Sequence, residues 1–390
     1  MILLEVIFWS GLFLLFYSYI GYPLFLIVVS KMMSPKSLRK REVERWTTVS
    51  ILIAAYNEEK VIRDKLKNCL ALDYPAELLE IYVASDGSSD KTNDIVRRYA
   101  EKEKRIHLLE FPRTGKSGVL NKAMACIKSE IVVFSDANTE YIREALINLV
   151  KHFSDEKVGC VCGRLIYRNP GEIVSGKGES LYWRYETVLK KMESRLGYVA
   201  GANGAIYAIR RELFEPLPAG TINDDFTISM RIVQKGFRSV YDENAIAYED
   251  VAPNMESEFR RHVRDAVGHY IAVYHMIGLL NPFLGLRSFI YWSHRLLRWA
   301  APFVLIVLFF VNMLLLNNLF YLFLFILHLG FYLLAVVGLI YVKTKNLPLF
   351  MYVSFYFCNL NLALLLGFLK AVMGKQKMTW ERTERLPKNV

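Results

Sequence analysis

The 390-residue sequence lacks several features that define common protein classes. Its five cysteines are scattered and odd in number, which argues against a disulfide framework and is typical of a reducing compartment. Cys160 and Cys162 lie in a strand-like run without the spacing of a zinc-ligand pair, so we expect both to be buried apolar side chains. The pattern G-x-x-x-x-G-K-[ST] is absent as well, which excludes a P-loop nucleotide-binding site.

Charged side chains are missing from three long stretches, residues 6–29, 299–342 and 347–369. A helix needs about 20 apolar residues to cross a hydrocarbon core of about 30 Å, so the first stretch predicts one span. The second is long enough for two spans hinged near Asn317 and Asn318, and the third for one more. The first stretch is too long for the apolar part of a signal peptide, and Glu5 stands in place of a basic n-region. We therefore expect residues 1–30 to remain as a membrane anchor.

Basic side chains gather just beyond the first stretch, at Lys31, Lys36, Arg39, Lys40, Arg41 and Arg45. Positive charge beside a span marks the cytoplasmic side, so the next segment is expected in the cytoplasm, in a multi-pass protein of the plasma (inner) membrane. The net charge of +11 then reflects contact with anionic headgroups or an anionic donor, and no nucleic acid partner is needed. Residues 256–298 mix charges with aromatics, which predicts helices in the interface plane ahead of membrane helices in 299–372.

The basic tail, residues 373–390, is expected in the cytoplasm for the same reason. Three spans after a cytoplasmic domain would leave this tail on the other side of the membrane. Two explanations remain open at this point. Either 347–369, with Asn359 and Asn361 in its middle, is a hairpin or a re-entrant segment, or 299–342 does not hold two spans.

Residues 46–255 show the alternation of strand-like and helical runs that is typical of a soluble α/β domain. The strand-like runs are 48–55, 79–85, 105–110 and 131–134. Each is followed by an amphipathic run, which predicts βαβ units and a Rossmann-like fold with a mainly parallel sheet. Ligands bind such sheets beyond the carboxyl ends of the strands, and unusual polar residues follow these strand ends.

Four aspartates and one lysine are the candidates for chemistry. Asp86 and Asp136 end strand-like runs, and Lys116 lies in a basic, glycine-containing loop before a helical run. Asp224 and Asp225 precede another helical run, and adjacent like charges raise the pKa of one partner, which helps a carboxylate accept a proton. Each position also has a plainer interpretation, as a turn former, a helix cap or a solvated lysine, so the combination carries the hypothesis.

Taken together, these segments resemble family 2 glycosyltransferases, which have the GT-A fold and, in their membrane branch, build or extend polysaccharides and glycolipids. The resemblance covers about two thirds of the chain and rests on the segments 51–59, 84–90, 115–121, 136–138, 201–211 and 223–225. It implies a cytoplasmic GT-A domain that transfers a sugar, with inversion, from a UDP- or GDP-linked donor to a glycan or lipid-linked acceptor. It also implies a nucleotide-sugar partner, a bilayer, and possible export or synthase partner subunits.

The resemblance implies roles for individual residues. Asp225 matches the last residue of the family's T-E-D motif and would be the general base. Asp136, with Asn138, would bind a Mg²⁺ or Mn²⁺ ion. Donor-binding roles fall to Ala55, Asn57, Glu58, Asp86, Lys116, Asp136, Arg261 and Arg264. Acceptor-binding roles fall to Gly201, Asn203 and Asp224.

The sequence departs from the family pattern in three places. Asn138 is a neutral ligand where the family usually has a second aspartate, which leaves a metal ion with less charge compensation. Asn223 and Asp224 replace the threonine and glutamate of the T-E-D motif. Processive members carry Q-x-x-R-W, whereas residues 261–265 read Arg-His-Val-Arg-Asp, without the tryptophan. This motif therefore does not support processive synthesis.

Two other functions remain open. A polyprenyl-phosphate glycosyltransferase would need no base, because its acceptor is already an anion, so Asp225→Asn would leave it active. A catalytically inactive GT-A module would serve as a membrane scaffold or an export partner, and it would show no nucleotide binding. The leading hypothesis instead predicts loss of transfer in Asp225→Asn with donor binding retained.

Overall fold

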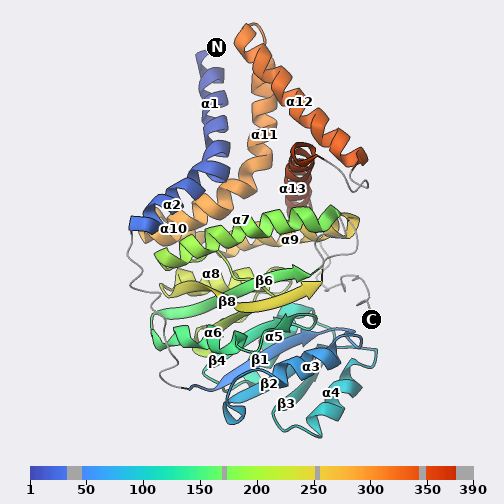
Figure 1. Cartoon of the computed structure of the whole chain (residues 1–390). Coiled ribbons are helices and arrows are strands. Elements are labelled where there is room, and N and C mark those ends of the chain that lie inside the picture. The colour runs from blue at the N-terminus through green and yellow to red at the C-terminus, as the bar shows by residue number, and fades with distance from the viewer. Residues whose placement is uncertain (33–45, 169–173, 251–254, 342–347, 375–390) are drawn as a thin grey trace.

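The computed structural model describes residues 1–32, 46–168, 174–250, 255–341 and 348–374 (Figure 1). A domain built around one sheet occupies the lower part of this view, and apolar helices project from its upper side. Most of the basic cluster after the first span, from Lys36 to Arg45, lies outside the described residues, as does the tail from residue 375 onward.

The sheet has eight strands in the order β3-β2-β1-β4-β7-β6-β8-β5. Four of them form a parallel block, β1 (Val49–Ala55), β2 (Leu79–Asp86), β3 (Ile106–Phe111) and β4 (Ile131–Asp136). The others are β5 (Glu140–Tyr141), β6 (Val158–Arg168), β7 (Tyr207–Arg210) and β8 (Arg238–Asp250). β7 is antiparallel to β4 and β6, β8 is parallel to β6, and β5 is antiparallel to β8. The four predicted strands are confirmed as β1 to β4. The strand-like run around Cys160 and Cys162 is β6, where both cysteines are buried as predicted, whereas β5, β7 and β8 were not predicted.

The register of the parallel block aligns the strand ends. Ala55 of β1 pairs with Ser85 of β2, and Ala54 pairs with Asp136 at the end of β4. The polar residues that follow these strands therefore meet at one edge of the sheet, as the sequence predicts.

Helices cover both faces of the sheet because its central strands are buried on both sides. Ile51 and Ile53 of β1 join one core, with α3 (Ile62–Leu70), α4 (Thr92–Ala100) and α6 (Ala145–Val150). Leu52 and Ala54 join the other core, with α5 (Lys116–Cys126) and α8 (Asp224–Gln234). Successive side chains of β1 point to opposite faces of the sheet, so this one strand packs against the helices on both faces. Short 3₁₀ turns lie at η2 (Ala76–Leu78), η3 (Lys151–Ser154) and η4 (Arg211–Leu213).

Four helical segments among the described residues are long and apolar enough to cross a membrane, Ile2–Met32, Leu286–Leu314, Leu319–Tyr341 and Leu349–Val372. The first joins α1 (Ile2–Phe16), the π-helical η1 (Tyr17–Gly21) and α2 (Tyr22–Met32). The second joins α10 (Leu286–Ile290), the π-helical η7 (Tyr291–Leu296) and α11 (Leu297–Leu314). Both segments change direction near their π-helical part (Figure 1), a known cause of helix bends.

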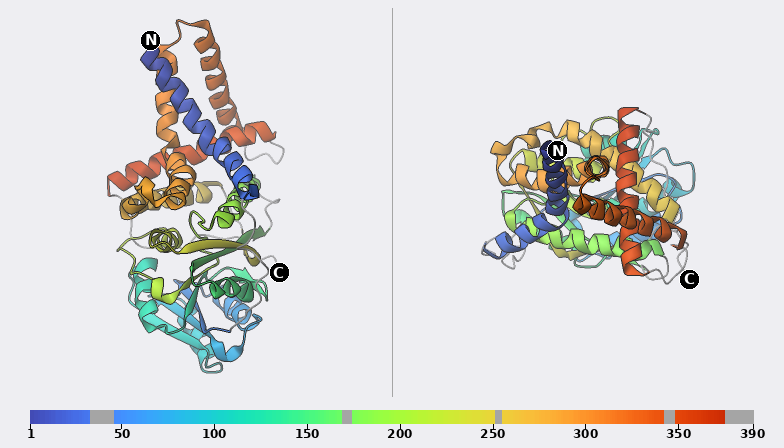
Figure 2. Two further views of the ribbon diagram at one scale, coloured as in Figure 1. Left: turned by 90° about the vertical axis from the view of Figure 1, so that its left-hand side faces the viewer. Right: turned by 90° about the horizontal axis from the view of Figure 1, so that it is seen from above.

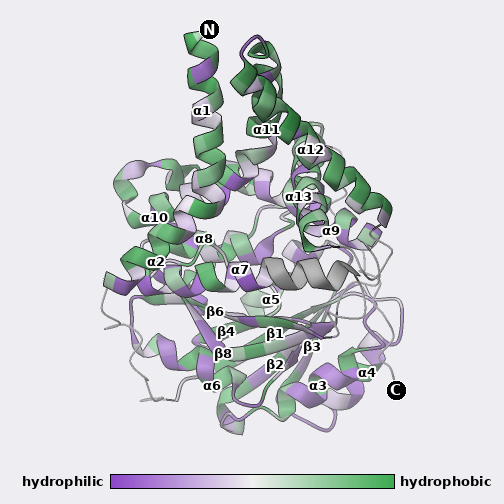
Figure 3. Cartoon of the chain, turned by 45° about the horizontal axis from the view of Figure 1, so that its top comes forward, coloured by the Kyte–Doolittle hydropathy of each residue, from purple (hydrophilic) through white to green (hydrophobic). Residues whose placement is uncertain are grey.

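The last two apolar segments are α12 (Leu319–Tyr341) and α13 (Leu349–Val372). The break between α11 and α12 contains the predicted hinge at Asn317 and Asn318. α13 is one continuous helix, so the hairpin interpretation of 347–369 is wrong. α1, α11 and α12 extend away from the sheet domain, whereas α13 runs across them (Figure 2). Apolar residues dominate the projecting helices (Figure 3).

Two long helices, α7 (Val174–Leu196) and α9 (Met255–His275), separate the sheet from the apolar helices (Figure 1). α7 packs against α2, where Tyr22 and Leu26 meet Leu189. α9 packs against α13, where the Tyr356 hydroxyl donates to the Glu258 carboxylate at 3.2 Å. Two 3₁₀ turns, η5 (Ile277–Leu280) and η6 (Pro282–Leu284), link α9 to α10.

Candidate active site

Polar turns tie the carboxyl ends of β1 and β2 together. Asn57 has a φ of 55°, a conformation that asparagine tolerates better than most residues other than glycine. Its side-chain oxygen accepts a hydrogen bond from the Ser89 amide at 2.8 Å, and its own amide donates to the Ser88 hydroxyl at 3.1 Å. Ala55 and Glu58 flank this turn and are buried, so their contact with a donor stays a prediction. These three predicted donor-binding residues thus lie together at the strand edge.

Asp86, at the end of β2, holds the loop that leads into α5. Its carboxylate is buried and accepts hydrogen bonds from the amides of Thr114 at 2.6 Å and Gly115 at 3.1 Å. Arg113 completes the set with an ion pair at 2.7 Å. Gly115 has a φ of 83°, which allows the sharp turn into the helix. The predicted contact between Asp86 and a nucleobase remains a prediction, because its oxygens here bind the loop.

Arg113 and Tyr56 form a flat surface beside this loop that the sequence prediction missed. The Arg113 guanidinium carbon lies 3.2 Å from the centre of the Tyr56 ring. A planar cation stacked on an aromatic ring offers both charge and a stacking face to a nucleotide. Tyr56 stands inside the segment 51–59, so its place next to a strand end was the available signal.

Lys116, the first residue of α5, bridges two aspartates that are distant in sequence. Its Nζ lies 3.0 Å from Asp136 Oδ1 and 3.2 Å from Asp224 Oδ1. Burial alone would lower the pKa of Lys116, but the charges of Asp136, Asp224 and Asp225 outweigh burial and raise this pKa above its ordinary value. Lys116 is therefore a permanent cation between carboxylates.

Asp224 and Asp225 begin α8 and face the same space. Burial raises the pKa of both carboxyl groups, and repulsion from Asp224 helps to raise the pKa of Asp225 to about 6. A Cβ atom built on Gly204 would stand 3.4 Å from Asp225 Oδ2 and 3.8 Å from Asp136 Oδ2. Glycine at 204 therefore keeps open the space between these two carboxylates. Gly204 lies in the segment 201–211, which carries part of the family resemblance, but no role was predicted for it.

A narrow pocket borders this group of charges. Its walls come from β1, β4, α5, the loop before β7 and the start of α8, through Leu52, Ala54, Lys116, Leu120, Phe134, Ser135, Gly204 and Asp224. The pocket therefore joins an apolar strand face to the charged residues.

The residues predicted to hold a metal ion fit one in part. Asn138 donates from Nδ2 to Glu249 at 2.7 Å, and its Oδ1 is buried with no hydrogen-bond partner in the structure. This oxygen and the Asp136 carboxylate, two residues away, are ligands of the kind that Mg²⁺ and Mn²⁺ prefer. Over the described ranges, no group of three or more His, Cys, Asp or Glu side chains has the arrangement of a metal site. An ion here would take its remaining ligands from phosphates and water, as Mg²⁺ commonly does.

The predicted acceptor-binding residues Gly201 and Asn203 lie in the loop 200–204, which precedes β7. Gly201 has a φ of 101°, and a Cβ atom there would lie 2.7 Å from the Phe226 ring. Asn203 is buried, donates to the Gly163 carbonyl at 3.1 Å and accepts a hydrogen bond from Lys190. The Asn203 side chain is thus occupied inside the fold, so a contact with an acceptor would have to be indirect.

Arg261 and Arg264 lie on α9, which passes the start of α8. The side-chain amide of Asn223 donates to the Asp265 carbonyl at 2.9 Å and fixes this approach. Arg264 pairs with Asp265 at 3.1 Å, and Arg261 lies about one turn earlier on the same helix. The two arginines are therefore on an element that touches the site, and their contact with a donor stays a prediction.

Comparison with known proteins identifies a family for the part of the chain that carries the strand-end residues. Residues 50–217 match the family model described as glycosyl transferase family 2. The chain is similar to the beta-monoglucosyldiacylglycerol synthase of Trichormus variabilis, with 28% identity over 238 residues that make up 59% of this chain and 50% of that protein. It is also similar to the poly-beta-1,6-N-acetyl-D-glucosamine synthase of Staphylococcus aureus, with 27% identity over 240 residues, 60% of this chain and 58% of that protein. The chain therefore spans about half of the length of these curated relatives.

A solved structure extends the likeness to the whole architecture. The mannosyltransferase PcManGT from Pyrobaculum calidifontis, in complex with GDP-Man and Mn²⁺, has a TM-score of 0.69 and 22% identity to this chain. The match covers 96% of this chain and 100% of that one. It confirms the predicted GT-A fold with flanking apolar helices. Residues 50–217, which contain Asp86, Lys116 and Asp136, are therefore a glycosyl transferase family 2 domain.

Proposed function

We propose that the protein is an inverting glycosyltransferase that transfers a sugar from a UDP- or GDP-linked donor to a glycan or lipid-linked acceptor at the cytoplasmic membrane face. One observation carries this proposal. Lys116, Asp136, Asp224 and Asp225 converge around Gly204, at the strand edge where α/β sheets bind ligands. The named relatives, a glycolipid synthase and a polysaccharide synthase, support a role in one of these two processes.

The donor side must hold a nucleoside diphosphate whose negative charge grows as the bond to the sugar breaks. Lys116 provides a fixed cation at the strand edge, and Arg113 provides a second one stacked on Tyr56. We assign Arg261 and Arg264 on α9 to the same anion. Cations placed in advance at the position where charge develops lower the barrier to bond breaking.

Asp136 and Asn138 would hold a divalent cation, which would stabilise the charge on the departing diphosphate. The complex of PcManGT with GDP-Man and Mn²⁺ supports a divalent metal in this role, and either Mg²⁺ or Mn²⁺ suits these oxygen ligands. Asn138 contributes no charge, so Asp136 alone provides charge compensation from this pair.

Asp225 acts as the base on the acceptor side. It takes the proton of the acceptor hydroxyl while the acceptor oxygen bonds to the anomeric carbon. The bond between that carbon and the diphosphate breaks, and the nucleoside diphosphate leaves with the electron pair. A pKa of about 6 makes Asp225 a stronger base than an ordinary aspartate, yet leaves it mostly ionised at neutral pH.

The test combines transfer with donor binding in one preparation. Full-length protein in lipid nanodiscs is screened for UDP or GDP release from a panel of nucleotide sugars, with membrane lipid extracts as acceptors. Donor binding is measured by titration calorimetry with Mn²⁺. Asp94→Asn is the control, because this aspartate has a 64% exposed side chain on α4 and pairs only with surface residues.

Three results separate the possible functions. Loss of transfer in Asp225→Asn with donor binding retained supports an inverting transfer that uses a base. Near-normal transfer in this variant refutes the base and favours a polyprenyl-phosphate acceptor, which is already an anion. Absence of nucleotide binding in the wild-type protein refutes the enzyme proposal and favours a scaffold.

We further propose that α1, α11 and α12 cross the membrane, and that α13 lies in the interface plane. α13 follows α9 along its length. Tyr356 bonds to Glu258, and about three turns later the Phe368 ring contacts the Tyr270 ring, with 5.3 Å between their centres. The two contacts are separated by the same number of residues on α9 and on α13, so the two helices run nearly parallel over this length. This proposal differs from the sequence prediction, in which the last helix within 299–372 also crosses the membrane.

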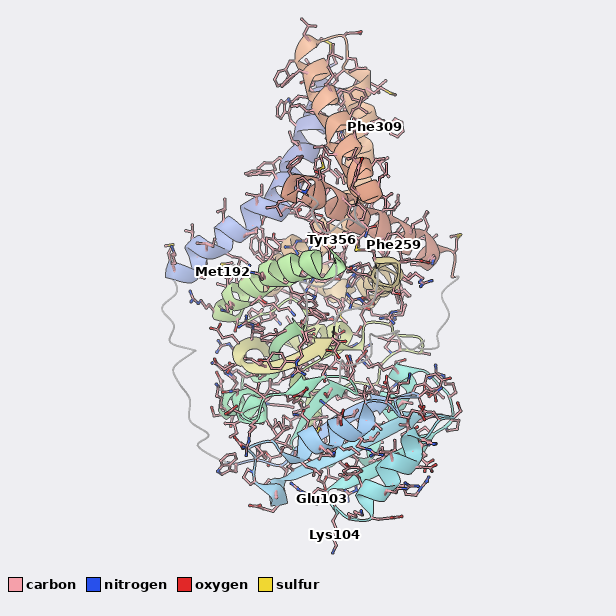
Figure 4. The ribbon with its side chains drawn as sticks, turned by 45° about the vertical axis from the view of Figure 1, so that its right-hand side comes forward. Glu103, Lys104, Met192, Phe259, Phe309 and Tyr356 are labelled. Carbon is pink, nitrogen blue, oxygen red and sulfur yellow. The ribbon has the colours of Figure 1, made fainter. Side chains whose placement is uncertain are left out.

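This arrangement explains the basic tail. With three crossings, the N-terminus and the turn between α11 and α12 share one side of the membrane (Figure 1). The sheet domain and the end of α13 share the other, so the tail and the basic cluster after α2 both face the cytoplasm. In Figure 4, Phe309 lies in the projecting helices, Tyr356 at the boundary, and Glu103 and Lys104 at the far end of the sheet domain.

Reporter fusions test this topology. Alkaline phosphatase inserted in the turn 315–318 should be active, and a fusion after Gly374 should be inactive, with green fluorescent protein giving the opposite pattern. An active phosphatase fusion after Gly374 would show a fourth crossing and refute the in-plane position of α13.

A further inference from the structure

A buried cluster of charged residues joins the sheet domain to the apolar helices. Glu186 and Glu193 of α7 face His294 of η7, at 3.2 Å from Nε2 and 2.5 Å from Nδ1 respectively. Arg298 of α11 lies 2.6 Å from Glu186. Burial alone would raise the pKa of both glutamates, but His294, and at Glu186 also two arginines, outweigh burial and lower it. Both glutamates are therefore anions, although their side chains are almost completely buried.

This cluster reaches the loop 200–204 through Ala200. Glu193 Oε2 accepts a hydrogen bond from the Ala200 amide at 3.0 Å, while its Oε1 accepts one from the Tyr22 hydroxyl at 2.8 Å. Arg295 donates through Nε to the Ala200 carbonyl at 2.7 Å and through Nη2 to the same oxygen. Both backbone groups of Ala200 are thus bound by side chains, one from α7 and one from η7. Tyr22 links the same carboxylate to α2.

The other end of this loop borders the candidate catalytic carboxylates. Gly204 lies between Asp225 and Asp136, and Gly201 packs on the ring of Phe226, the residue after Asp225. Ala200 and Gly204 lie four residues apart in this loop, and the residues between them are held by hydrogen bonds from the Ala202 amide to Ser229 and from the Asn203 side chain to Gly163. Ala200 and Gly204 are thus the two ends of one short, hydrogen-bonded segment. Misplacement of reacting groups by about 1 Å can cost about 100-fold in rate. The position of Ala200 therefore bears on catalysis.

Both places where the apolar helices bend contribute to these contacts, η7 directly through Arg295 and the bend at η1 through Tyr22, which binds Glu193. Arg295 and His294 belong to η7, and Tyr22 follows η1 directly. The two π-helical segments also touch each other, because the Tyr17 hydroxyl and the Ser293 hydroxyl lie 2.9 Å apart. π-helical turns are rare and occur frequently at functional sites. Two of them meet here, beside a loop of the active site.

We propose that Glu193, Arg295 and Tyr22 are positioning residues, which set the loop 200–204 against the catalytic carboxylates and thereby make turnover depend on the membrane-embedded helices. The inference rests on the proposed function of the same site. None of the three residues contacts the strand-end residues assigned to the donor. Their loss therefore lowers kcat and leaves donor affinity unchanged.

Arg295→Lys is the first test variant. Lysine keeps the charge but lacks the two donors that bind the Ala200 carbonyl together. Arg287→Lys is the matched control, since Arg287 of α10 also donates to backbone carbonyls, at the far end of α8. In nanodiscs, kcat should fall about 10- to 100-fold in Arg295→Lys and stay within about twofold in Arg287→Lys, with the donor Kd unchanged in both. Turnover is normalised to donor-binding sites, so misfolded protein does not count.

Tyr22→Phe, which removes only the hydroxyl that binds Glu193, is the second. Hydrogen exchange of the segment 198–204 should become faster in this variant and stay unchanged in Tyr270→Phe. Tyr270 is the matched control because its hydroxyl binds the Trp299 carbonyl and joins α9 to α11, without a hydrogen bond to Glu193 or to the backbone of the loop.

The outcomes separate this inference from the proposed function. An unchanged kcat in Arg295→Lys, or unchanged exchange of 198–204 in Tyr22→Phe, overturns the positioning role. An equal loss of kcat and donor affinity in Arg295→Lys also overturns it, because the contacts would then serve the whole fold. Wild-type protein that binds no donor and transfers no sugar refutes the proposed function, and the exchange experiment still tests whether Tyr22 holds the loop.

Discussion

Replacement of Asp225 by asparagine should remove catalysis and stabilise the protein at the same time. Asparagine keeps an oxygen where Asp225 Oδ1 accepts a hydrogen bond from the Phe226 amide at 2.8 Å, so the local contact at the start of α8 survives. It cannot accept the acceptor proton. General base catalysis contributes about 10²- to 10⁴-fold, and kcat should fall by that factor while the donor Kd stays within about twofold.

The gain in stability follows from the raised pKa of Asp225. A carboxyl group with a pKa of about 6, against an ordinary 3.8, opposes folding when ionised, and the shift corresponds to about 3 kcal/mol. Partial solvent screening reduces this cost to about 1–2 kcal/mol. The cost is absent below about pH 4, where the group is protonated in both states, and complete above about pH 6. Asparagine never ionises, so its advantage should grow over this interval.

The assay is thermal unfolding of wild type, Asp225→Asn and Asp94→Asn in the same nanodiscs at pH 4.5, 6 and 8. Scan rates are matched, because unfolding of a membrane protein is commonly irreversible. Asp225→Asn should unfold at a temperature closer to wild type at pH 4.5 and clearly higher at pH 8, while Asp94→Asn follows wild type throughout. If Asp225→Asn unfolds at a lower temperature than wild type at pH 8, or if its unfolding temperature differs from wild type by the same amount at every pH, the raised pKa of Asp225 and its assignment as the base are both refuted.

Three further predictions concern the same site. Lys116→Met removes the cation that opposes the raised pKa of Asp225, so the acid limb of the pH–rate profile should move above pH 6 and the donor KM should rise; an unmoved limb contradicts the ion-pair account. Asn138→Asp adds charge compensation, so half-maximal activity should need about tenfold less Mn²⁺, and the metal-free protein should melt lower because the new carboxylate faces Glu249. Gly204→Ala should lower kcat/KM at least tenfold without loss of folded protein, whereas Gly330→Ala, in open surroundings on α12, should change nothing.

The parallel half of the sheet could be predicted because its information is local. β1, β2 and β4 are apolar runs bounded by polar turns, and their helices show their own periodicity. β8 escaped prediction because Arg238–Asp250 carries several charged side chains and lacks a clean alternation. It is a strand because β6 and β5 pair with it on both sides, and pairing between distant segments leaves little trace in one segment alone.

The active site shows the same limit at the level of single residues. Strand-end aspartates could be selected by their position in the sequence, but the ion pairs of Lys116 depend on where α5 and α8 meet.

The buried charged face of α7 did leave a local signal in the sequence. Glu186, Lys190 and Glu193 repeat at the spacing of one helix face, and they all point inward. A charged face on a helix is usually solvated, so its burial required partners that only the fold reveals. The glutamates find theirs at His294 and Arg298 of the apolar segments, and Lys190 finds its own at Asn203. Charged residues on the otherwise buried face of an amphipathic helix therefore indicate a place where two parts of the molecule pack together, as well as a possible functional site.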